Sequence, residues 1–246
     1  MKVSLCTTVK NRLHQIKETL PYNLNSNQHP DVELVILDYW SSDGLEEWMK
    51  DNHSLDIEKG KIKYYKLVNP IDIFILTHAI NIAFKAAEGE IVCNVDADNF
   101  TGKEFGAYLI DFFNKPKMIG ASNGGYGLSG RKAFWRQDFI EIIGGYDEDL
   151  RYGWGFDEWD IQVRSERLGF EIHYFDNLAE GSYIHHNDEE RMKNNLLKKG
   201  ELWAPHRLHK AISLAKIDCG IYKANPYRQW GHAEVVKNFK LKTIIG

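Results

Sequence analysis

Two carboxylates, Asp96 and Asp98, stand one residue apart directly after the apolar run Glu90–Val95. In extended backbone, residues i and i+2 point to the same side, so both acids can face one site. Hard divalent cations such as Mg²⁺ or Mn²⁺ take oxygen ligands and bridge protein carboxylates to substrate phosphates. The pair therefore indicates metal-assisted chemistry on a phosphate-bearing substrate, although D-x-D alone is a weak motif that also occurs by chance in surface loops.

Two further clusters in the second half of the chain carry reactive side chains. Asp157 and Glu158 open an expected helix, where a carboxylate can serve as a general base and where both acids also complement the helix dipole. His185 and His186 precede a highly polar stretch, residues 187–199. An imidazole beside carboxylates favours Mn²⁺ over Mg²⁺, while adjacent histidines on a loop are often only solvated. The polar stretch is either a lid over the site or a disordered loop.

Strands and helices alternate through the first hundred residues and would position these groups. Apolar runs predict strands at Val3–Val9, Val32–Asp38, Ile62–Val68 and Glu90–Val95. Helical spacing predicts helices at Leu13–Leu20, Leu45–Met49 and Thr77–Glu88. This order indicates a single-domain α/β fold with a mostly parallel central sheet and flanking helices. Ligands bind such sheets at the carboxyl ends of the strands, where residues 10–12, Asp38 and residues 96–98 all fall.

The second half of the chain is less regular. We expect helices at Phe105–Phe113, Phe134–Ile143 and Glu158–Leu168, and a short strand at Glu171–Phe175. A glycine-rich stretch (Asn123–Gly130) and an acidic aromatic loop (Tyr146–Asp157) lie between them. From Ala204 to Gly246 there are eight Lys or Arg and two Asp or Glu, a balance of +6. This basic extension could pack on the domain, contact anionic lipid or a partner, or present an ordinary solvated face.

Composition excludes several classes of protein. Of the 246 residues, 43% are hydrophobic and 27% charged, which excludes wholesale disorder, and a net charge of −4 argues against a nucleic-acid partner. The three cysteines match neither a zinc site nor a disulfide framework. The N-terminus lacks a signal-peptide core and no run reaches the roughly 18–20 apolar residues that span a bilayer, so we expect a reducing, cytoplasmic setting. The 7 Trp and 12 Tyr suit carbohydrate sites, although most will serve in the core or on the surface.

Six segments in order resemble the GT-A glycosyltransferases, in particular the family-2 group. They are TTVKNR (7–12), Asp38 after VELVIL, AINIAFKAAEGE (79–90), DAD (96–98), GGYDE (144–148) and YGWGFDEWD (152–160). The second half is similar to β-1,4-galactosyltransferases and to chondroitin-polymerase-type domains. The resemblance implies a GT-A (Rossmann-like) catalytic domain over residues 1–203, with a nucleotide-binding half (1–100) and an acceptor-binding half (101–203). Residues 204–246 form the extension.

The resemblance also implies roles for the donor side of the site. Thr8, Lys10 and Arg12 match residues that contact the nucleotide and its phosphates, and Asp38 matches the acid that accepts from the base, usually uracil. Asn81 stands beside the donor in relatives. Asp98 matches the main metal ligand, Asp96 helps to place the nucleotide-sugar or the metal, and His186 aligns with a third ligand to Mn²⁺ (or Mg²⁺).

On the acceptor side, the resemblance implies that Trp154, Gly155 and Asp157 bind the acceptor and that Glu158 is the catalytic base. Asp160 is better suited to a structural role within the helix. Three departures from the family pattern stand out. Paired acids followed by Gly-Ser are replaced by Asp38-Tyr39-Trp40-Ser41, Leu76 and Ile80 stand where relatives often carry Arg, and Glu158 replaces a more common Asp.

These features predict a metal-dependent transferase that moves a sugar from a UDP-sugar to a hydroxyl of a glycan or other acceptor, with inversion. Two alternatives stay open. One is a retaining transferase on the same scaffold, and the other is a nucleotide-sugar or carbohydrate-binding module without turnover. A nucleotidyltransferase is less consistent, because TTVKNR is not the glycine-rich phosphate loop that such enzymes place after the first strand.

Overall fold

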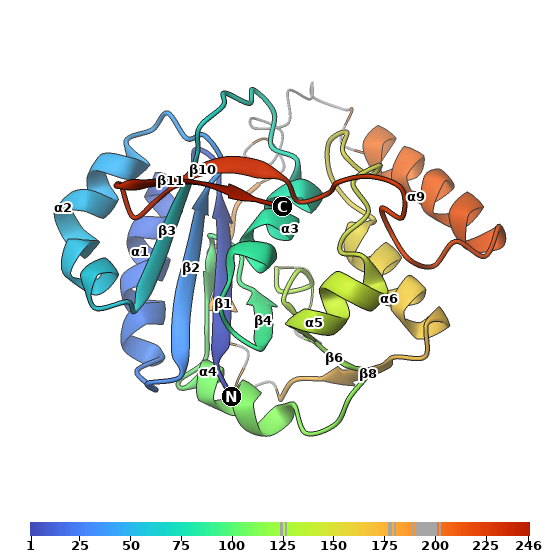
Figure 1. The fold of residues 1–246 in the computed structure, drawn as a ribbon, viewed down its shortest axis with the longest axis horizontal. Helices are drawn as coiled ribbons and strands as arrows, with labels where there is room; N and C mark the ends of the chain where they lie inside the picture. The colour runs from blue at the N-terminus through green and yellow to red at the C-terminus, as the bar shows by residue number, and fades with distance from the viewer. Residues whose placement is uncertain are drawn as a thin grey trace.

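The computed structural model describes residues 1–123, 125, 127–176, 179, 181–187, 189, 201 and 203–246. Within these residues one nine-stranded sheet runs through the molecule in the order β11-β10-β3-β2-β1-β4-β7-β6-β8 (Figure 1). Its parallel centre is β3 (Ile62–Leu67), β2 (Val32–Asp38), β1 (Val3–Val9) and β4 (Ile91–Asn94). The predicted α/β fold with a largely parallel core and flanking helices is confirmed.

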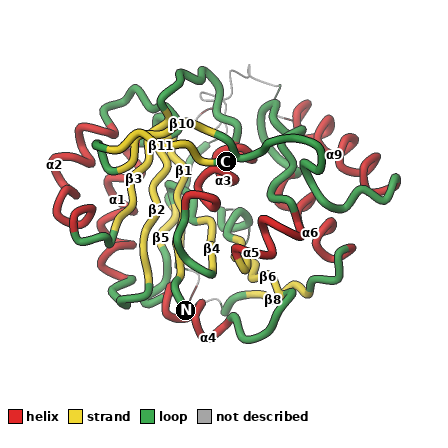
Figure 2. Tube along the Cα trace, viewed as in Figure 1, coloured by secondary structure: helices red, strands yellow, loops and turns green. Residues whose placement is uncertain are grey.

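Side chains alternate between two helical layers along the central strands. In β2, Leu34 and Ile36 pack with α1 (Leu13–Ser26) and α2 (Leu45–Glu58). Val35 and Leu37 point the other way and pack against α3 (Leu76–Ala86). Because both faces are covered, the strand is buried along its whole length, and apolar residues predominate in its sequence on both faces. The first-half helices α1 and α2 lie together at one side of the strands (Figure 2).

The second half adds antiparallel strands to the sheet. After α4 (Phe105–Phe112), β6 (Met118–Ala121) and β7 (Lys132–Trp135) form a pair, and β7 joins the sheet beside β4. The helix expected at Phe134–Ile143 is therefore wrong in its first two residues. Pairing with β4 holds both Phe134 and Trp135 extended, and β6 pairs with Phe134 on the other edge. Helical backbone begins at α5 (Arg136–Asp138) and continues as the π-helix Phe139–Ile143.

The acidic aromatic loop leads into α6 (Asp157–Arg167), which is followed by β8 (Glu171–Tyr174) at the far edge of the sheet. A separate two-stranded ladder joins β5 (Asn99–Phe100) to β9 (Ser182–Tyr183). The helix α9 (Trp203–Asp218) lies beside α6, at the end of the molecule away from α1 and α2 (Figure 1).

The C-terminal segment completes the central sheet. Strand β10 (Ala233–Lys237) pairs antiparallel with β3, and β11 (Leu241–Ile245) pairs with β10. Several of its basic side chains meet acids of the chain itself: Lys216 with Asp147 and Asp149, Arg228 with Asp149, Lys237 with Glu88, and Lys242 with Glu234. Several basic side chains of this segment therefore form ion pairs within the chain. In the part of the chain that the structure describes, no helix combines the length and apolarity needed to cross a membrane.

Candidate active site

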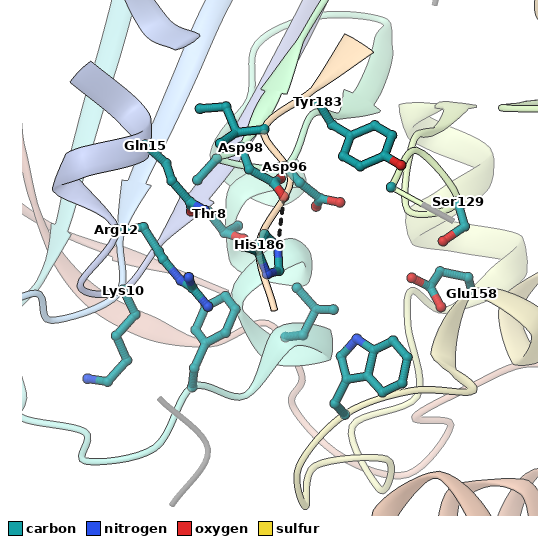
Figure 3. A pocket seen from close by; sticks show the side chains of 16 residues that line it. Thr8, Lys10, Arg12, Gln15, Asp96, Asp98, Ser129, Glu158, Tyr183 and His186 are labelled. Atoms are coloured by element: carbon teal, nitrogen blue, oxygen red, sulfur yellow. Dashed lines mark hydrogen bonds and ion pairs between the residues drawn. The ribbon is translucent and has the colours of Figure 1, made fainter. Parts of the chain in front are cut away.

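A cavity of about 170 Å³ opens where β1 and β4 end (Figure 3). Its wall combines the end of β1, the segment after β4, the start of α6 and the segment after β9. The described residues that line it are Thr8, Lys10, Arg12, Gln15, Phe74, Leu76, Asp96, Ala97, Asp98, Gly127, Ser129, Trp154, Glu158, Tyr183, Ile184 and His186. The site thus lies at the carboxyl ends of the parallel strands, as expected for such a sheet.

Asp98 and His186, 88 residues apart, meet in this cavity with Oδ2 and Nε2 separated by 2.9 Å. The β5–β9 ladder explains the meeting, because it pairs Asn99 with Tyr183, and the Ile184 N–H donates to the Asp98 carbonyl at 2.8 Å. Both side chains keep limited exposure, 13% for Asp98 and 12% for His186, so they can reach a ligand in the cavity.

Asp96 faces the same cavity and is held by its neighbours. The Asn94 side-chain amide donates to its Oδ1 at 2.8 Å. A Cβ on Gly130 would lie 2.7 Å from Asp96 Oδ2, so the end of the glycine-rich stretch can pass this carboxylate only without a side chain. Burial, and then the negative charges of Asp98 and Glu158, raise the pKa of Asp96 to about 7.

Glu158 reaches the cavity because the chain makes a sharp turn before α6. Gly155 and Phe156 both have left-handed backbone, with φ of +96° and +76°. His209 of α9 donates from Nδ1 to the Gly155 carbonyl at 2.8 Å and fixes this turn. In Figure 3 the Glu158 carboxylate points into the cavity from the side opposite Lys10 and Arg12.

Asp157, the preceding residue, points away from solvent and does not line the cavity. It is 3% exposed, and its Oδ2 has no hydrogen-bond partner among the described residues. Burial, and then the charge of Glu158, raise its pKa well above the ordinary value of an aspartate. Of the two acids that open α6, Glu158 is therefore the one placed to meet a substrate.

The two basic residues after β1 differ in their surroundings. Lys10 points its ammonium away from the centre of the cavity and donates to the carbonyls of Tyr39 (3.4 Å), Trp40 (3.2 Å) and Ile71 (2.5 Å). Burial lowers its pKa. Arg12 extends its guanidinium toward the middle of the cavity in Figure 3, so it is the better placed of the two to contact an anionic ligand.

Two residues that the resemblance assigns to the donor do not line the cavity. Asp38 is fully buried, and its carboxylate accepts from the Ser41 N–H at 2.6 Å and the Tyr64 hydroxyl at 2.7 Å. Asn81 is also fully buried, and its amide bonds the Tyr146 carbonyl at 2.9 Å and Glu148 at 3.0 Å. Here both side chains hold neighbouring turns in place, and their contact with a donor stays a prediction of the resemblance.

The structure brings Thr8, Lys10, Arg12, Asp96, Asp98, His186, Trp154 and Glu158 to one cavity, whereas Asp38, Asn81, Gly155 and Asp157 stand outside its lining. Sequence reasoning missed Gln15, Ser129 and Tyr183. Ser129 lies in the glycine-rich stretch, and Tyr183 lies just before the two histidines, so each had a sign in the sequence. Gln15 lies on an amphipathic helix and its pattern offers no sign. The polar stretch 187–199, interpreted as a lid or a disordered loop, lies almost entirely outside the described residues.

The donor set fits a divalent cation. Asp98 Oδ2 and His186 Nε2 converge on the cavity and Asp96 stands beside them, which is the mixture of carboxylate and imidazole that suits Mn²⁺. Among the described residues no three His, Cys, Asp or Glu side chains already gather as a complete site. A cation here would complete its coordination with oxygens from a bound phosphate or water, as Mg²⁺ and Mn²⁺ do in nucleotide enzymes.

Solved structures show which class of protein has this fold. It is similar to the mannosyltransferase PcManGT from Pyrobaculum calidifontis, in complex with GDP-Man and Mn²⁺ (TM-score 0.62, 16% identity, 89% of this chain and 72% of that one). It is similar to S. aureus TarS 1–349 in complex with UDP-GlcNAc (TM-score 0.61, 19% identity, 87% of this chain and 66% of that one). It also resembles glucosyl-3-phosphoglycerate synthase from Mycobacterium tuberculosis in complex with Mn²⁺, UDP and glucosyl-3-phosphoglycerate (TM-score 0.58, 19% identity, 89% of this chain and 80% of that one). The chain thus has the GT-A fold of glycosyltransferases.

The sequence match is more specific than the fold. Residues 4–170 match the Glycosyl transferase family 2. The chain belongs to this family and is a glycosyltransferase. No curated protein sequence matches it.

Proposed function

We propose that this glycosyltransferase uses a UDP-sugar donor and Mn²⁺, and that it transfers the sugar with inversion to a hydroxyl of a glycan in polysaccharide or glycan biosynthesis. The observation that carries the proposal is one cavity that holds Arg12, the Asp98–His186 pair and the Glu158 carboxylate. Structures of TarS with UDP-GlcNAc and of glucosyl-3-phosphoglycerate synthase with UDP and Mn²⁺ support the choice of nucleotide.

Asp98 and His186 would hold the cation, with Asp96 beside them. When bound, the cation neutralises charge on the diphosphate as the bond to the sugar breaks. Two carboxylates close together in a partly buried site are unfavourable without a counter-charge, and burial followed by the charges of Asp98 and Glu158 raises the pKa of Asp96. This arrangement therefore favours a cationic ligand.

The part of the cavity proposed to bind the nucleotide-sugar offers N–H groups that can hydrogen-bond to phosphate and ribose oxygens. Arg12 supplies a guanidinium, whose charge-assisted hydrogen bonds suit a diphosphate. Gln15 is 3% exposed and lines the cavity, and its Nε2 finds no partner among the described residues. A buried amide N–H without a hydrogen bond costs free energy, so an oxygen of the nucleotide-sugar is its natural partner. Lys10 and Asp38 act one step away, by fixing the loops at the ends of β1 and β2.

Glu158 is the general base of the proposed reaction. The carboxylates that line the described cavity are Asp96, Asp98 and Glu158, and the first two face the cation site. Glu158 takes the proton of the acceptor hydroxyl as its oxygen attacks the anomeric carbon. A new C–O bond forms on one face of the sugar, the bond to the diphosphate breaks on the other, and UDP leaves.

The acceptor half follows the resemblance to the β-1,4-galactosyltransferases. Trp154 offers a ring for the sugar face, and Gly155 forms part of the turn that presents Glu158, while contact of Gly155 and Asp157 with the acceptor stays a prediction of the resemblance. On this proposal the product has the opposite anomeric configuration to the donor. A product of the same configuration would assign the chain to the retaining alternative.

Membrane contact through residues 204–246 is a secondary proposal, which flotation with anionic phospholipid vesicles would test.

The test is release of nucleoside diphosphate across a panel of UDP- and GDP-sugars, with Mn²⁺ or with EDTA. The wild type is compared with Glu158→Gln, His186→Ala and a control, Glu166→Gln, which replaces an exposed acid on the same helix. We expect Mn²⁺-dependent release from one UDP-sugar. Glu158→Gln should lower acceptor-dependent turnover by about 10²–10⁴-fold while UDP still binds.

The outcomes separate the parts of the proposal. His186→Ala should need a higher Mn²⁺ concentration for half-maximal release, whereas Glu166→Gln should behave as wild type. Release that is insensitive to EDTA would remove the metal from the proposal, and release only from a GDP-sugar would change the donor. Binding of nucleotide-sugars without any turnover would favour a binding module.

A further inference from the structure

An aromatic surface extends outward from the acceptor side of the cavity. It consists of Trp154, Phe156, Trp159, Trp203 and His206. The rings of Trp154 and Trp203 lie 6.0 Å apart, and His206 lies 5.5 Å from Trp203 and 5.4 Å from Phe156. Trp159 packs on Phe156 at 4.7 Å. Two of these residues are large and yet well exposed: Trp159 at 44% and Trp203 at 49%.

This aromatic surface is continuous with the cavity. Trp154 belongs to both, because it lines the cavity beside Glu158 and also packs edge-to-face on Trp203. Two hydrogen bonds fasten α9, which carries Trp203 and His206, to the region of Glu158. His209 donates to the Gly155 carbonyl at 2.8 Å, and the Ser213 hydroxyl donates to Asp160 at 2.6 Å. The rings therefore have a fixed position relative to Glu158.

The size of the cavity limits what it can enclose. About 170 Å³ is less than the roughly 300–1,000 Å³ of pockets that bury a drug-sized ligand. It cannot enclose a nucleotide-sugar and an acceptor together, so part of the bound molecules must lie on the surface around it. Any further part of the acceptor must then leave on the side of Glu158, because Arg12 and Lys10 bound the other side (Figure 3).

The chemistry of this exit path suits carbohydrate. Large exposed apolar patches mark interaction sites, ligand-binding surfaces among them, and this one adjoins a sugar-transfer site through Trp154. The apolar face of a ring packs on sugar C–H groups, while the indole N–H and the imidazole reach hydroxyls. A lone aromatic residue needs no explanation of this kind, but five in contact at the rim of a sugar-transfer site do.

We propose that the acceptor is an oligosaccharide of at least two residues, whose second sugar packs on Trp154, Trp203 and His206. The inference rests on the proposed function and adds a subsite to it. It makes Trp203 a determinant of acceptor length, whereas the first acceptor sugar is selected inside the cavity, near Glu158.

The experiment measures transfer to matched mono-, di- and trisaccharides that end in glucose, galactose, N-acetylglucosamine, N-acetylgalactosamine or glucuronic acid. The donor is the one hydrolysed in the release assay. Wild type, Trp203→Ala, Trp203→Phe and Leu208→Ala are compared. Leu208 is a matched control, because it is 47% exposed on the same helix and belongs to no ring contact of the aromatic surface.

The expected result is a kcat/KM that rises from mono- to disaccharide in the wild type. Trp203→Ala should lower the ratio of disaccharide to monosaccharide kcat/KM about tenfold, which corresponds to the loss of one ring–sugar contact. The loss should appear mainly in KM. Trp203→Phe should recover most of the ratio, and Leu208→Ala should retain it.

Several results would overturn the subsite. They are equal kcat/KM for mono- and disaccharides in the wild type, an equal ratio in Trp203→Ala and Leu208→Ala, or donor hydrolysis that no saccharide accelerates. The last result would point to a non-carbohydrate acceptor. If Trp203→Ala fails to fold, the length dependence of the wild type and the behaviour of Trp203→Phe still decide. Absence of release from every donor would instead refute the proposed function, and the subsite with it.

Discussion

Replacement of Arg164 by Met tests how α6 is held in position to present Glu158. Arg164 is 1% exposed and pairs through Nε with Oδ2 of the equally buried Asp160 at 2.8 Å. Its other nitrogens donate to the carbonyls of Ile143 (3.3 Å), Tyr222 (3.2 Å) and Gly145 (3.1 Å). Methionine keeps much of the volume but leaves Asp160 charged and buried and leaves three carbonyls without this donor.

The magnitude follows from that loss. Removal of one partner from a buried ion pair costs about 3–5 kcal/mol, because the remaining charge is left uncompensated. For a chain of 246 residues, each kcal/mol corresponds to about 2 °C in Tm, so we expect a fall of about 6–10 °C. The double variant Asp160→Asn, Arg164→Met removes both charges and should recover much of this loss, since the introduced amide can still accept from the Ser213 hydroxyl.

Thermal and urea unfolding followed by circular dichroism would measure these changes. The control is Arg167→Met, which removes an exposed arginine from the same helix and should shift stability by no more than about 0.5 kcal/mol. If Arg164→Met were no more destabilising than Arg167→Met, the buried pair would not hold α6. If the double variant were no more stable than Arg164→Met alone, the uncompensated charge would not be the cause of the loss.

Three further predictions concern the site itself. Gly155→Ala should cost about 1–3 kcal/mol of stability and reduce transfer, because φ is +96° and the new Cβ would lie 2.8 Å from His206; urea unfolding and the transfer assay measure both. Asp157→Asn should raise Tm at pH 8. The folded-state pKa of Asp157 lies above its unfolded value, so the wild type loses stability as pH rises from the unfolded pKa toward the folded one. The Tm difference should shrink toward pH 4, and equal differences at both pH values would contradict this reasoning. Gln15→Leu should weaken UDP binding by roughly five- to tenfold in calorimetry, whereas Gln137→Leu, at an exposed position, should not.

Part of the fold follows directly from the sequence. The predicted strands Val3–Val9 and Val32–Asp38 agree with β1 and β2 residue for residue. Both strands are buried on two faces, so apolar residues predominate in them instead of alternating with exposed polar ones. The convergence of the residues at the ends of β1 and β4 is predictable for the same reason, and Thr8, Arg12 and the acids 96–98 do line one cavity.

Other features depend on contacts that a sequence pattern does not contain. Pairing of β10 with β3 joins residues about 170 positions apart, and β10 alone looks like any short, half-polar segment. The end of β7 is extended because Phe134 pairs with both β4 and β6 and Trp135 pairs with β4, and these pairings are not visible in the local sequence. Side-chain direction is equally hidden, so the motif that contains Asp38 could be recognised while its buried hydrogen bonds to Ser41 and Tyr64 could not.

Different parts of the chain supply the residues of the cavity and the contacts that hold Glu158. The family match ends at residue 170, so it includes Arg12, Asp98 and Glu158, whereas His186 of the cation site lies beyond it. What holds Glu158 in place lies largely beyond that point. His209 fixes the turn at Gly155, Ser213 bonds Asp160, and the Tyr222 carbonyl accepts from Arg164. Trp203 and His206 form the outer part of the aromatic surface on the same C-terminal helix. A segment outside the matched region thus fixes the turn before Glu158, and on our proposal it also carries the acceptor subsite. Because this segment carries Trp203 and His206 of the proposed subsite, we expect acceptor specificity to depend on it more than on the residues around Asp98.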